Sequence, residues 1–202
     1  MSGVPGYRPR RRDLLRRIVF GSTRRMYGSS FEPMRVVAHH KPLLLGYTAV
    51  SLSHETFSRA LPARPKKLAM LRAAQLTGCE WCLDFGSRLA ADAGIPSEDL
   101  RSLAIWRTSD RFDEVDRLVL EYAEGMTRTP VDVSDSLVAA LGEHFDERAL
   151  VELTMSVALE NLHSRFNWAL GIESEGFSEG LYCVRPEAAE SSSGLEAVPG
   201  AR

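Results

Sequence analysis

The chain has 202 residues, of which 44% are hydrophobic and 26% are charged, as expected for one soluble globular domain with tails. Its net charge of −2 is unevenly spread, because residues 1–25 hold eight arginines and one acid, while the remaining 17 basic and 26 acidic residues give the body a charge of −9. An acidic body with a basic arm excludes a general nucleic-acid binder, and no run reaches the roughly 18–20 apolar residues of a membrane span.

The basic segment, residues 1–30, is predicted to be an arm that precedes the main domain. Residues 1–12 are rich in Gly, Pro and Arg and are expected to have no fixed structure. Residues 13–27 are expected to form an amphipathic helix, since apolar residues recur at helical spacing at Leu14, Leu15, Ile18 and Val19. The favoured interpretation is a helix that packs this apolar stripe on the body and leaves its arginines in water. Docking on a membrane surface or on a protein partner is the alternative.

The main domain is predicted to span residues 31–185. Its first part, up to residue 61, has a helical pattern with breaks at Pro33 and Pro42. Pro65 is expected to open the next helix, because proline is tolerated in a first helical turn, and Gly78 is expected to end it.

The second half of the main domain also shows only helical patterns. A helix is expected after the cysteines Cys79 and Cys82 and should end at Gly94. Ser97 is expected to cap the helix that follows. Residues 112–126, FDEVDRLVLEYAEGM, carry one apolar stripe and predict an amphipathic helix, which Pro130 ends.

Two further caps are expected at Ser134 and Asp146, the second opening a long helix from residue 147 to about 170. Residues 186–202 are rich in Ala, Glu, Ser, Gly and Pro and are expected to be a disordered tail. The predicted fold is therefore all-α, with several helices joined by short loops and with disordered tails.

The stretch GCEWC, residues 78–82, contains two of the three cysteines. A structural zinc site would need four ligands, but the third cysteine stands alone and no two histidines have the usual spacing, so no metal site is expected. Cys79 and Cys82 are then either small buried residues or a redox pair. The redox interpretation has a physical basis, since a cysteine at a helix start has a lowered pKa and two sulfurs one turn apart can form a disulfide. Asp84 and Ser87 are close enough to influence protons there, although a solvated acid and a plain helix hydroxyl are the simpler interpretations.

Three segments resemble the carboxymuconolactone decarboxylase-like superfamily: KKLAMLRAAQLTGCEWC, GIPSEDLRSL and ALVELTMSVALENLHSRFNWALGI. Because the cysteine pair is present, the chain is more similar to the alkyl hydroperoxidase D-like branch, over about residues 31–183. The resemblance implies an all-α fold, a homo-oligomer such as a trimer or hexamer, and a dithiol that reduces peroxides or disulfides. It also implies that Cys82 is the peroxide-reactive thiol and Cys79 the resolving one.

The proton relay of that family does not carry over. The family has a glutamate twelve residues before the first cysteine and a histidine four after the second, whereas this chain has Lys67 and Gly86 there. Lys67 can lower the pKa of a thiol by Coulomb attraction but cannot act as a carboxylate base. Asp84 and Ser87 are candidate substitutes.

Five polar residues crowd the predicted last helix: Glu160, Asn161, His163, Arg165 and Asn167. The favoured interpretation is a helix surface or a subunit contact. In the alternative, His163 reaches the cysteines and replaces the missing histidine, since its pKa suits proton transfer near neutrality.

The sequence thus predicts a dithiol oxidoreductase that reduces a peroxide or disulfide through Cys79 and Cys82 and is restored by an external thiol donor. No cofactor or metal motif is present in the sequence, and three cysteines fit a reducing cytoplasm better than a secreted disulfide framework. The alternatives are a non-catalytic helical scaffold with a docking arm and a redox sensor whose disulfide changes the oligomeric state.

Overall fold

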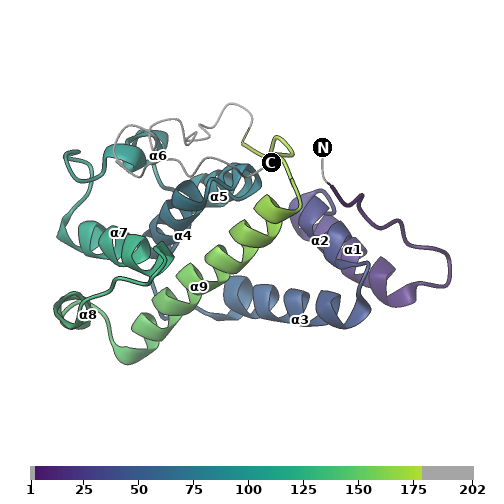
Figure 1. Cartoon of the computed structure of the whole chain (residues 1–202), viewed down its shortest axis with the longest axis horizontal. Coiled ribbons are helices and arrows are strands. Elements are labelled where there is room, and N and C mark those ends of the chain that lie inside the picture. Colours follow the sequence, from purple (N-terminus) through teal and green to yellow (C-terminus); the bar gives the residue numbers. More distant parts are fainter. Residues whose placement is uncertain (1–2, 179–202) are drawn as a thin grey trace.

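A computed structural model describes residues 3–178, and every regular element in that range is a helix, which confirms the predicted all-α class (Figure 1). The α-helices are α1 (Leu14–Tyr27), α2 (Glu32–Val37), α3 (Lys41–Leu52), α4 (Ala63–Thr77), α5 (Glu80–Asp92), α6 (Ser97–Ser102), α7 (Glu114–Thr127), α8 (Asp135–Gly142) and α9 (Glu147–Ala169). A π-helical turn, Ser53–Phe57, continues α3, and a 3₁₀ turn, Leu103–Ile105, follows α6. The predicted tail 186–202 and Cys183 lie outside the described residues. Within residues 3–178, no helix combines the length and the apolar character needed to cross a membrane.

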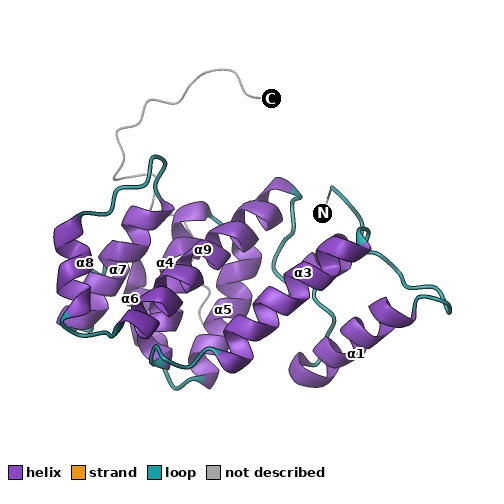
Figure 2. Ribbon diagram, turned by 90° about the horizontal axis from the view of Figure 1, so that it is seen from below, coloured by secondary structure: helices purple, strands orange, loops and turns teal. Residues whose placement is uncertain are grey.

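Helix α4 lies at the centre of the molecule and separates two apolar clusters. Leu68 and Leu71 on one of its faces pack in a cluster with residues of α2, α3 and α5. Ala69 and Ala73 on another face pack in a second cluster with residues of α7, α8 and α9. Figure 1 shows α9 running diagonally across the molecule, and Figure 2 shows α3 between α1 and the helices α4 to α9. The long helix α9 therefore passes both clusters and can bring side chains to either.

The helix ends follow the local chemistry that the sequence indicates. Gly78 has φ +69° and ends α4, which requires the left-handed conformation that glycine adopts without strain. Ser134 and Asp146 cap α8 and α9 as predicted, each accepting a backbone N–H three residues on. Ser97 was expected to be a cap, but it is the first residue of α6, and its hydroxyl caps nothing.

Pro33 and Pro42 start helices instead of breaking one. Each occupies the first turn of its helix, α2 or α3, where the missing N–H group is not needed. The segment between residues 31 and 61 is consequently two helices and a π-helical turn.

The N-terminal residues pack on the body. Residues 3–12, expected to have no fixed structure, are held by hydrogen bonds from Gly3 N–H to Leu170 O and from Tyr7 N–H to Arg35 O. Helix α1 is present as predicted, but the face that it buries differs, since its buried residues are Arg16, Val19, Phe20 and Thr23, while Leu14 and Ile18 are exposed. Arg16 turns inward because its guanidinium donates to Ala38 O and lies 4.1 Å from the centre of the Tyr7 ring.

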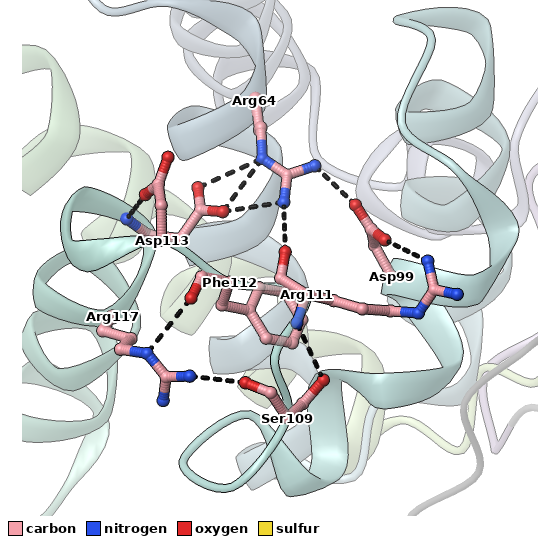
Figure 3. Close-up of polar contacts among 8 residues, drawn as sticks. Arg64, Asp99, Ser109, Arg111, Phe112, Asp113 and Arg117 are labelled. Carbon is pink, nitrogen blue, oxygen red and sulfur yellow. Dashed lines mark hydrogen bonds and ion pairs between the residues drawn. The ribbon is translucent and has the colours of Figure 1, made fainter.

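An arginine-centred network fixes the connection between α6 and α7 to the start of α4 (Figure 3). Arg64 donates to both carboxylate oxygens of Asp116, to Asp99 Oδ2 at 2.7 Å and to the backbone oxygen of Arg111. Arg117 donates to backbone oxygens of the same connection. One guanidinium thus joins three segments, which holds α4 in place at the end opposite the cysteines.

Candidate functional site

The two cysteines lie at the start of α5, as predicted. Gly78 turns the chain, Cys79 is the N-cap residue of α5, and Cys82 lies one turn further. They form a disulfide with a Cα–Cα distance of 5.3 Å, and Cys79 Sγ also accepts the N–H of Cys82 at 3.2 Å. Unpaired N–H groups at a helix start favour a thiolate, so both sulfurs are in a position that supports redox chemistry.

Two side chains of α9 point polar hydrogens at the sulfurs. Ser164 Oγ is 3.3 Å from Cys82 Sγ, and Asn167 Nδ2 is 3.4 Å from Cys82 Sγ and 3.7 Å from Cys79 Sγ. Both Ser164 and Asn167 are completely buried. Donors aimed at a buried sulfur favour its charged form, so Asn167 would stabilise a thiolate at Cys82, as would Ser164 when its hydrogen points to the sulfur.

Glu160 lies one turn before Ser164 on the same helix. Its Oε1 atom is 2.8 Å from Ser164 Oγ, so a chain of hydrogen bonds connects the carboxyl group to Cys82. Burial raises the pKa of Glu160 to about 7, and the negative charge of Glu55 acts in the same direction, while the Ser164 hydroxyl and Lys67 oppose it. Glu160 can therefore hold or release a proton near neutral pH.

A cavity of about 190 Å³ opens beside the disulfide. Its walls are largely apolar and come from α1, α3, α5 and the start of α2, including Met26, Tyr27, Phe31, Met34, Trp81 and Phe85. Glu160 and His163 lie in the wall together with Cys82, whereas Cys79 is not among the lining residues. A small apolar molecule in this cavity would meet only the second cysteine.

Lys67 does not contact the cysteines. Its Nζ atom is 2.8 Å from Glu55 Oε2, and Glu55 Oε1 lies 3.4 Å from His54 Nδ1, so Lys67 of α4 forms a cluster with these two residues of the π-helical turn. Burial would raise the pKa of Glu55, but His54 and Lys67 lower it to about 2. The lysine thus neutralises a carboxylate at the edge of the cavity.

His163 lies in the cavity wall, as one interpretation of the sequence required, but its ring is occupied by other partners. Its Nε2 atom is 3.4 Å from Ser51 Oγ, and its ring lies 4.9 Å from that of Tyr47. Burial and the nearby His54 lower the pKa of His163 to about 4. A histidine that is neutral at pH 7 and bonded elsewhere is poorly matched to proton transfer with a thiol near neutrality.

Asp84 faces away from the cavity and holds the segment after α9. Its carboxylate accepts hydrogen bonds from the hydroxyls of Ser174 and Ser178 and from the backbone N–H groups of residues 175–178. Burial would raise the pKa of Asp84, but these donors outweigh it and hold the pKa below its usual value. Asp84 is therefore an anchor of the fold and is not placed to exchange protons with the cysteines.

Neither Ser87 nor Gly86 contributes a relay group. The Ser87 hydroxyl is buried and has no hydrogen-bond partner among the described residues. Gly86 lines the cavity, and a Cβ atom there would lie 3.0 Å from Leu71 Cδ2, so a larger side chain would require Leu71 to move.

Replacing Asp84 by alanine is expected to lower the free energy of unfolding by about 3 kcal/mol at pH 7, because hydrogen bonds to a charged acceptor stabilise by about 1.5–3 kcal/mol each and water restores part of the loss. The folded-state pKa is depressed, so this stabilisation is present above pH ~4 and is lost as the pH falls through the lowered pKa. Urea unfolding at pH 7 and pH 3 measures both effects. Asp92→Ala is the matched control, since Asp92 is exposed on the same helix and pairs only with Arg88 among the described residues. Equal losses for the two variants at pH 7 would contradict the anchoring role.

The α9 residues of the site were not identified from the sequence. The sequence favours a surface or subunit contact for Glu160 and Asn167, yet both are buried, and it gives no prediction for the buried Ser164. A signal was present, because Leu153, Val157, Glu160, Ser164 and Asn167 recur at spacings of three and four and so continue one buried stripe.

Comparison with known proteins places this arrangement in context. Residues 45–125 match the family model described as the carboxymuconolactone decarboxylase family. The uncharacterized protein YnjA of Escherichia coli (strain K12) is 42% identical over 111 residues, which are 55% of this chain and 61% of that protein. The chain thus spans about three fifths of the length of this curated relative.

Solved structures share the fold at low sequence identity. The debrominase Bmp8 superposes with a TM-score of 0.75 at 17% identity, covering 87% of this chain and 94% of that chain. The alkylhydroperoxidase AhpD core of an uncharacterized peroxidase-related protein from Ralstonia eutropha JMP134 superposes with a TM-score of 0.73 at 15% identity, covering 83% and 90%. At these identities the likeness is one of fold.

Proposed function

We propose that this chain is a member of the carboxymuconolactone decarboxylase-like superfamily and a dithiol oxidoreductase that reduces organic peroxides through a Cys79–Cys82 disulfide, supported by the family-model match over residues 45–125 and by the shared fold. The observation that carries the proposal is the position of Cys82. Cys82 lines an apolar cavity, its sulfur lies 3.3 Å from Ser164 Oγ and 3.4 Å from Asn167 Nδ2, and it is bonded to Cys79.

The proposed cycle has three steps. The Cys82 thiolate attacks the outer oxygen of a hydroperoxide, so that the O–O bond breaks and a sulfenic acid and an alcohol form. The Cys79 thiol then condenses with the sulfenic acid, which gives the disulfide and water. Two equivalents of an external thiol reduce the disulfide and become a disulfide themselves.

The first test counts thiols in the reduced protein by alkylation and intact mass, before and after one equivalent of cumene hydroperoxide. We expect two of the three thiols to be lost, with peptide mapping to Cys79 and Cys82, and to return on treatment with a dithiol. Cys183 is the internal control, because it is expected to remain alkylatable. Three unchanged thiols would end the proposal.

A second candidate activity is reductive debromination of an aromatic compound. The debrominase Bmp8 has the same fold, and its C82A variant has been crystallised with 2,3,4-tribromopyrrole. In this chain, the aromatic walls supplied by Tyr27, Phe31, Trp81 and Phe85 favour a flat ring beside Cys82. Atoms and electrons balance in this reaction, since a dithiol and an aryl bromide give a disulfide, the debrominated arene and hydrogen bromide. Bromide release from 2,3,4-tribromopyrrole with loss of the same two thiols would support debromination. Loss of these thiols with a peroxide but not with the bromopyrrole would exclude it.

The basic arm and the assembly state belong to the same proposal. The arm is an integral part of the site, because Ser22, Thr23, Met26 and Tyr27 of α1 line the cavity. This favours an enzyme over a scaffold with a separate docking arm.

A homo-oligomer is proposed because α3, α9 and the turn between α3 and α4 expose large apolar side chains: Leu43, Leu45, Phe57, Val151, Met155 and Trp168.

A further inference from the structure

The hydroxyl of Ser164 lies between two acceptors but has only one hydrogen to donate. Cys82 Sγ is 3.3 Å away on one side, and Glu160 Oε1 is 2.8 Å away on the other. When Glu160 is ionised, Ser164 donates to it and accepts from a Cys82 thiol. When Glu160 is protonated, the carboxylic acid donates to Ser164 and Ser164 donates to a Cys82 thiolate. The two arrangements contain the same number of protons, so the chain can transfer one proton between the thiol and the carboxyl group.

The surroundings of Glu160 keep both arrangements accessible. Glu160 is 6% exposed, and no cation among the described residues is bound to it directly, because the nearby Lys67 is paired with Glu55. From the facing elements, Glu55 on the π-helical turn opposes ionisation and Lys67 on α4 favours it. His163 on α9 is neutral at pH 7, and Tyr47 on α3 stays protonated because burial raises its pKa. The pKa of about 7 for Glu160 lies within about two units of the usual thiol value of about 8.5, so proton exchange between them needs little free energy.

Glu160 also reaches the place where a substrate would react. It lines the same cavity as Cys82, and the leaving oxygen of a hydroperoxide bound there would lie in that cavity. Asn167 holds the sulfur from the other side through its 3.4 Å contact and carries no titratable group.

We propose that Glu160 is the general acid–base of the site, taking the proton of the Cys82 thiol through Ser164 and giving it to the leaving alkoxide of an uncharged organic hydroperoxide. The proposal rests on the peroxidase function proposed above. The carboxyl group of Glu160 on α9 would then be the proton-transfer group that Lys67, Gly86 and Asp84 do not supply.

The proposed step is balanced. The Cys82 thiolate attacks the outer oxygen of ROOH, the S–O bond forms and the O–O bond breaks, so that sulfur loses two electrons and the peroxide gains them. The alkoxide RO⁻ takes the proton from Glu160 and leaves as ROH, which leaves a sulfenic acid on Cys82 and a carboxylate at residue 160. The reactive pair therefore carries one proton in total, and the rate of the step is expected to be bell-shaped in pH.

The first experiment measures the coupling without any peroxide. The rate of Cys82 alkylation by iodoacetamide is measured as a function of pH in two proteins. One carries Cys79→Ser alone, and the other carries Cys79→Ser together with Glu160→Gln. Removal of a neighbouring negative charge is expected to lower the pH midpoint for alkylation by about one unit. Glu121→Gln is the matched control, because it makes the same chemical change at an exposed position of α7 and is expected to leave the midpoint in place.

The second experiment follows thiol loss in a single turnover with cumene hydroperoxide in the otherwise intact reduced protein. Glu160→Gln is expected to slow the reaction about 100-fold at pH 7.5 and to abolish the fall in rate at high pH. Glu160→Asp keeps an ionisable group and should retain that fall. Ser164→Ala breaks the connection without altering the carboxyl group and is expected to slow the reaction about tenfold.

The outcomes separate the two proposals. Equal alkylation midpoints with and without the Glu160→Gln change, in proteins of matching thermal stability, would overturn the coupling. An unchanged peroxide rate in both Glu160→Gln and Ser164→Ala would overturn the acid–base role. A wild-type protein that does not react with peroxide would overturn the proposed function, and the alkylation comparison would still decide whether Glu160 and Cys82 share a proton.

Discussion

Replacement of Cys82 by serine is expected to abolish peroxide reduction, with a loss of at least about 1,000-fold, because a serine hydroxyl is almost never ionised in this environment and is a far weaker nucleophile than a thiolate. Replacement of Cys79 by serine should have a different result. Cys82 would still react once, and the protein would stop as a sulfenic acid because no second thiol condenses with it. Multiple-turnover assays with a dithiol donor and trapping of the sulfenic acid by dimedone distinguish the two variants.

The geometry explains this expected difference between the cysteines. Only Cys82 of the pair lines the cavity, and Cys79 is 2% exposed behind it. Cys183→Ser serves as the control for removal of a thiol and is expected to behave as the wild type. If Cys79→Ser abolished the first reaction and Cys82→Ser preserved it, the roles of the two sulfurs would be reversed.

Loss of the buried Lys66–Glu152 pair is expected to have the largest effect on stability. Lys66 Nζ is 3.0 Å from Glu152 Oε1 and 2.8 Å from the backbone oxygen of His54, while Glu152 Oε2 accepts the N–H groups of Ala60 and Leu61. The pair joins α4 and α9 to the π-helical turn. Glu152→Gln leaves a buried ammonium group without its anion and is expected to cost about 3–5 kcal/mol in the free energy of unfolding.

The double variant Lys66→Met, Glu152→Gln tests the cause of that loss. It removes both charges but keeps an acceptor for the backbone N–H groups, so it should cost clearly less than the sum of the single changes. Guanidinium unfolding of the four proteins closes the cycle. Single changes that each cost under about 1 kcal/mol would show that water already solvates the pair.

Much of the fold could be predicted because its signals are local. The left-handed glycine at Gly78 and the side-chain caps at Ser134 and Asp146 depend on residues within one turn of the helix end, and the sequence displays them directly. Pro33 and Pro42 were misinterpreted because a proline indicates a helix start and a helix break by the same missing N–H group. The buried face of α1 was also predicted incorrectly, since the partners that draw Arg16 inward come from other segments of the chain.

The site could be predicted only in part for the same reason. The cysteine pair is a local motif with a helix start beside it, so its place at the N-terminus of α5 was predictable. Ser164 and Asn167 meet Cys82 across more than 80 residues of sequence, and no local pattern encodes that distance. Asp84 illustrates the opposite error, because closeness in sequence suggested a role near the cysteines, whereas its carboxylate binds the segment 174–178.

The capping position of Cys79 has a consequence for the design of inactive variants. The Cys79 sulfur accepts the N–H of Cys82 as the cap of α5, and in the proposed cycle its thiol also condenses with the sulfenic acid. Serine is among the best N-cap residues and alanine among the poorest, with a difference of about 1 kcal/mol. A serine at this position therefore removes the second thiol and keeps the start of the helix, whereas an alanine removes both the thiol and the cap. Only the serine variant gives a loss of activity that can be assigned to the missing thiol alone.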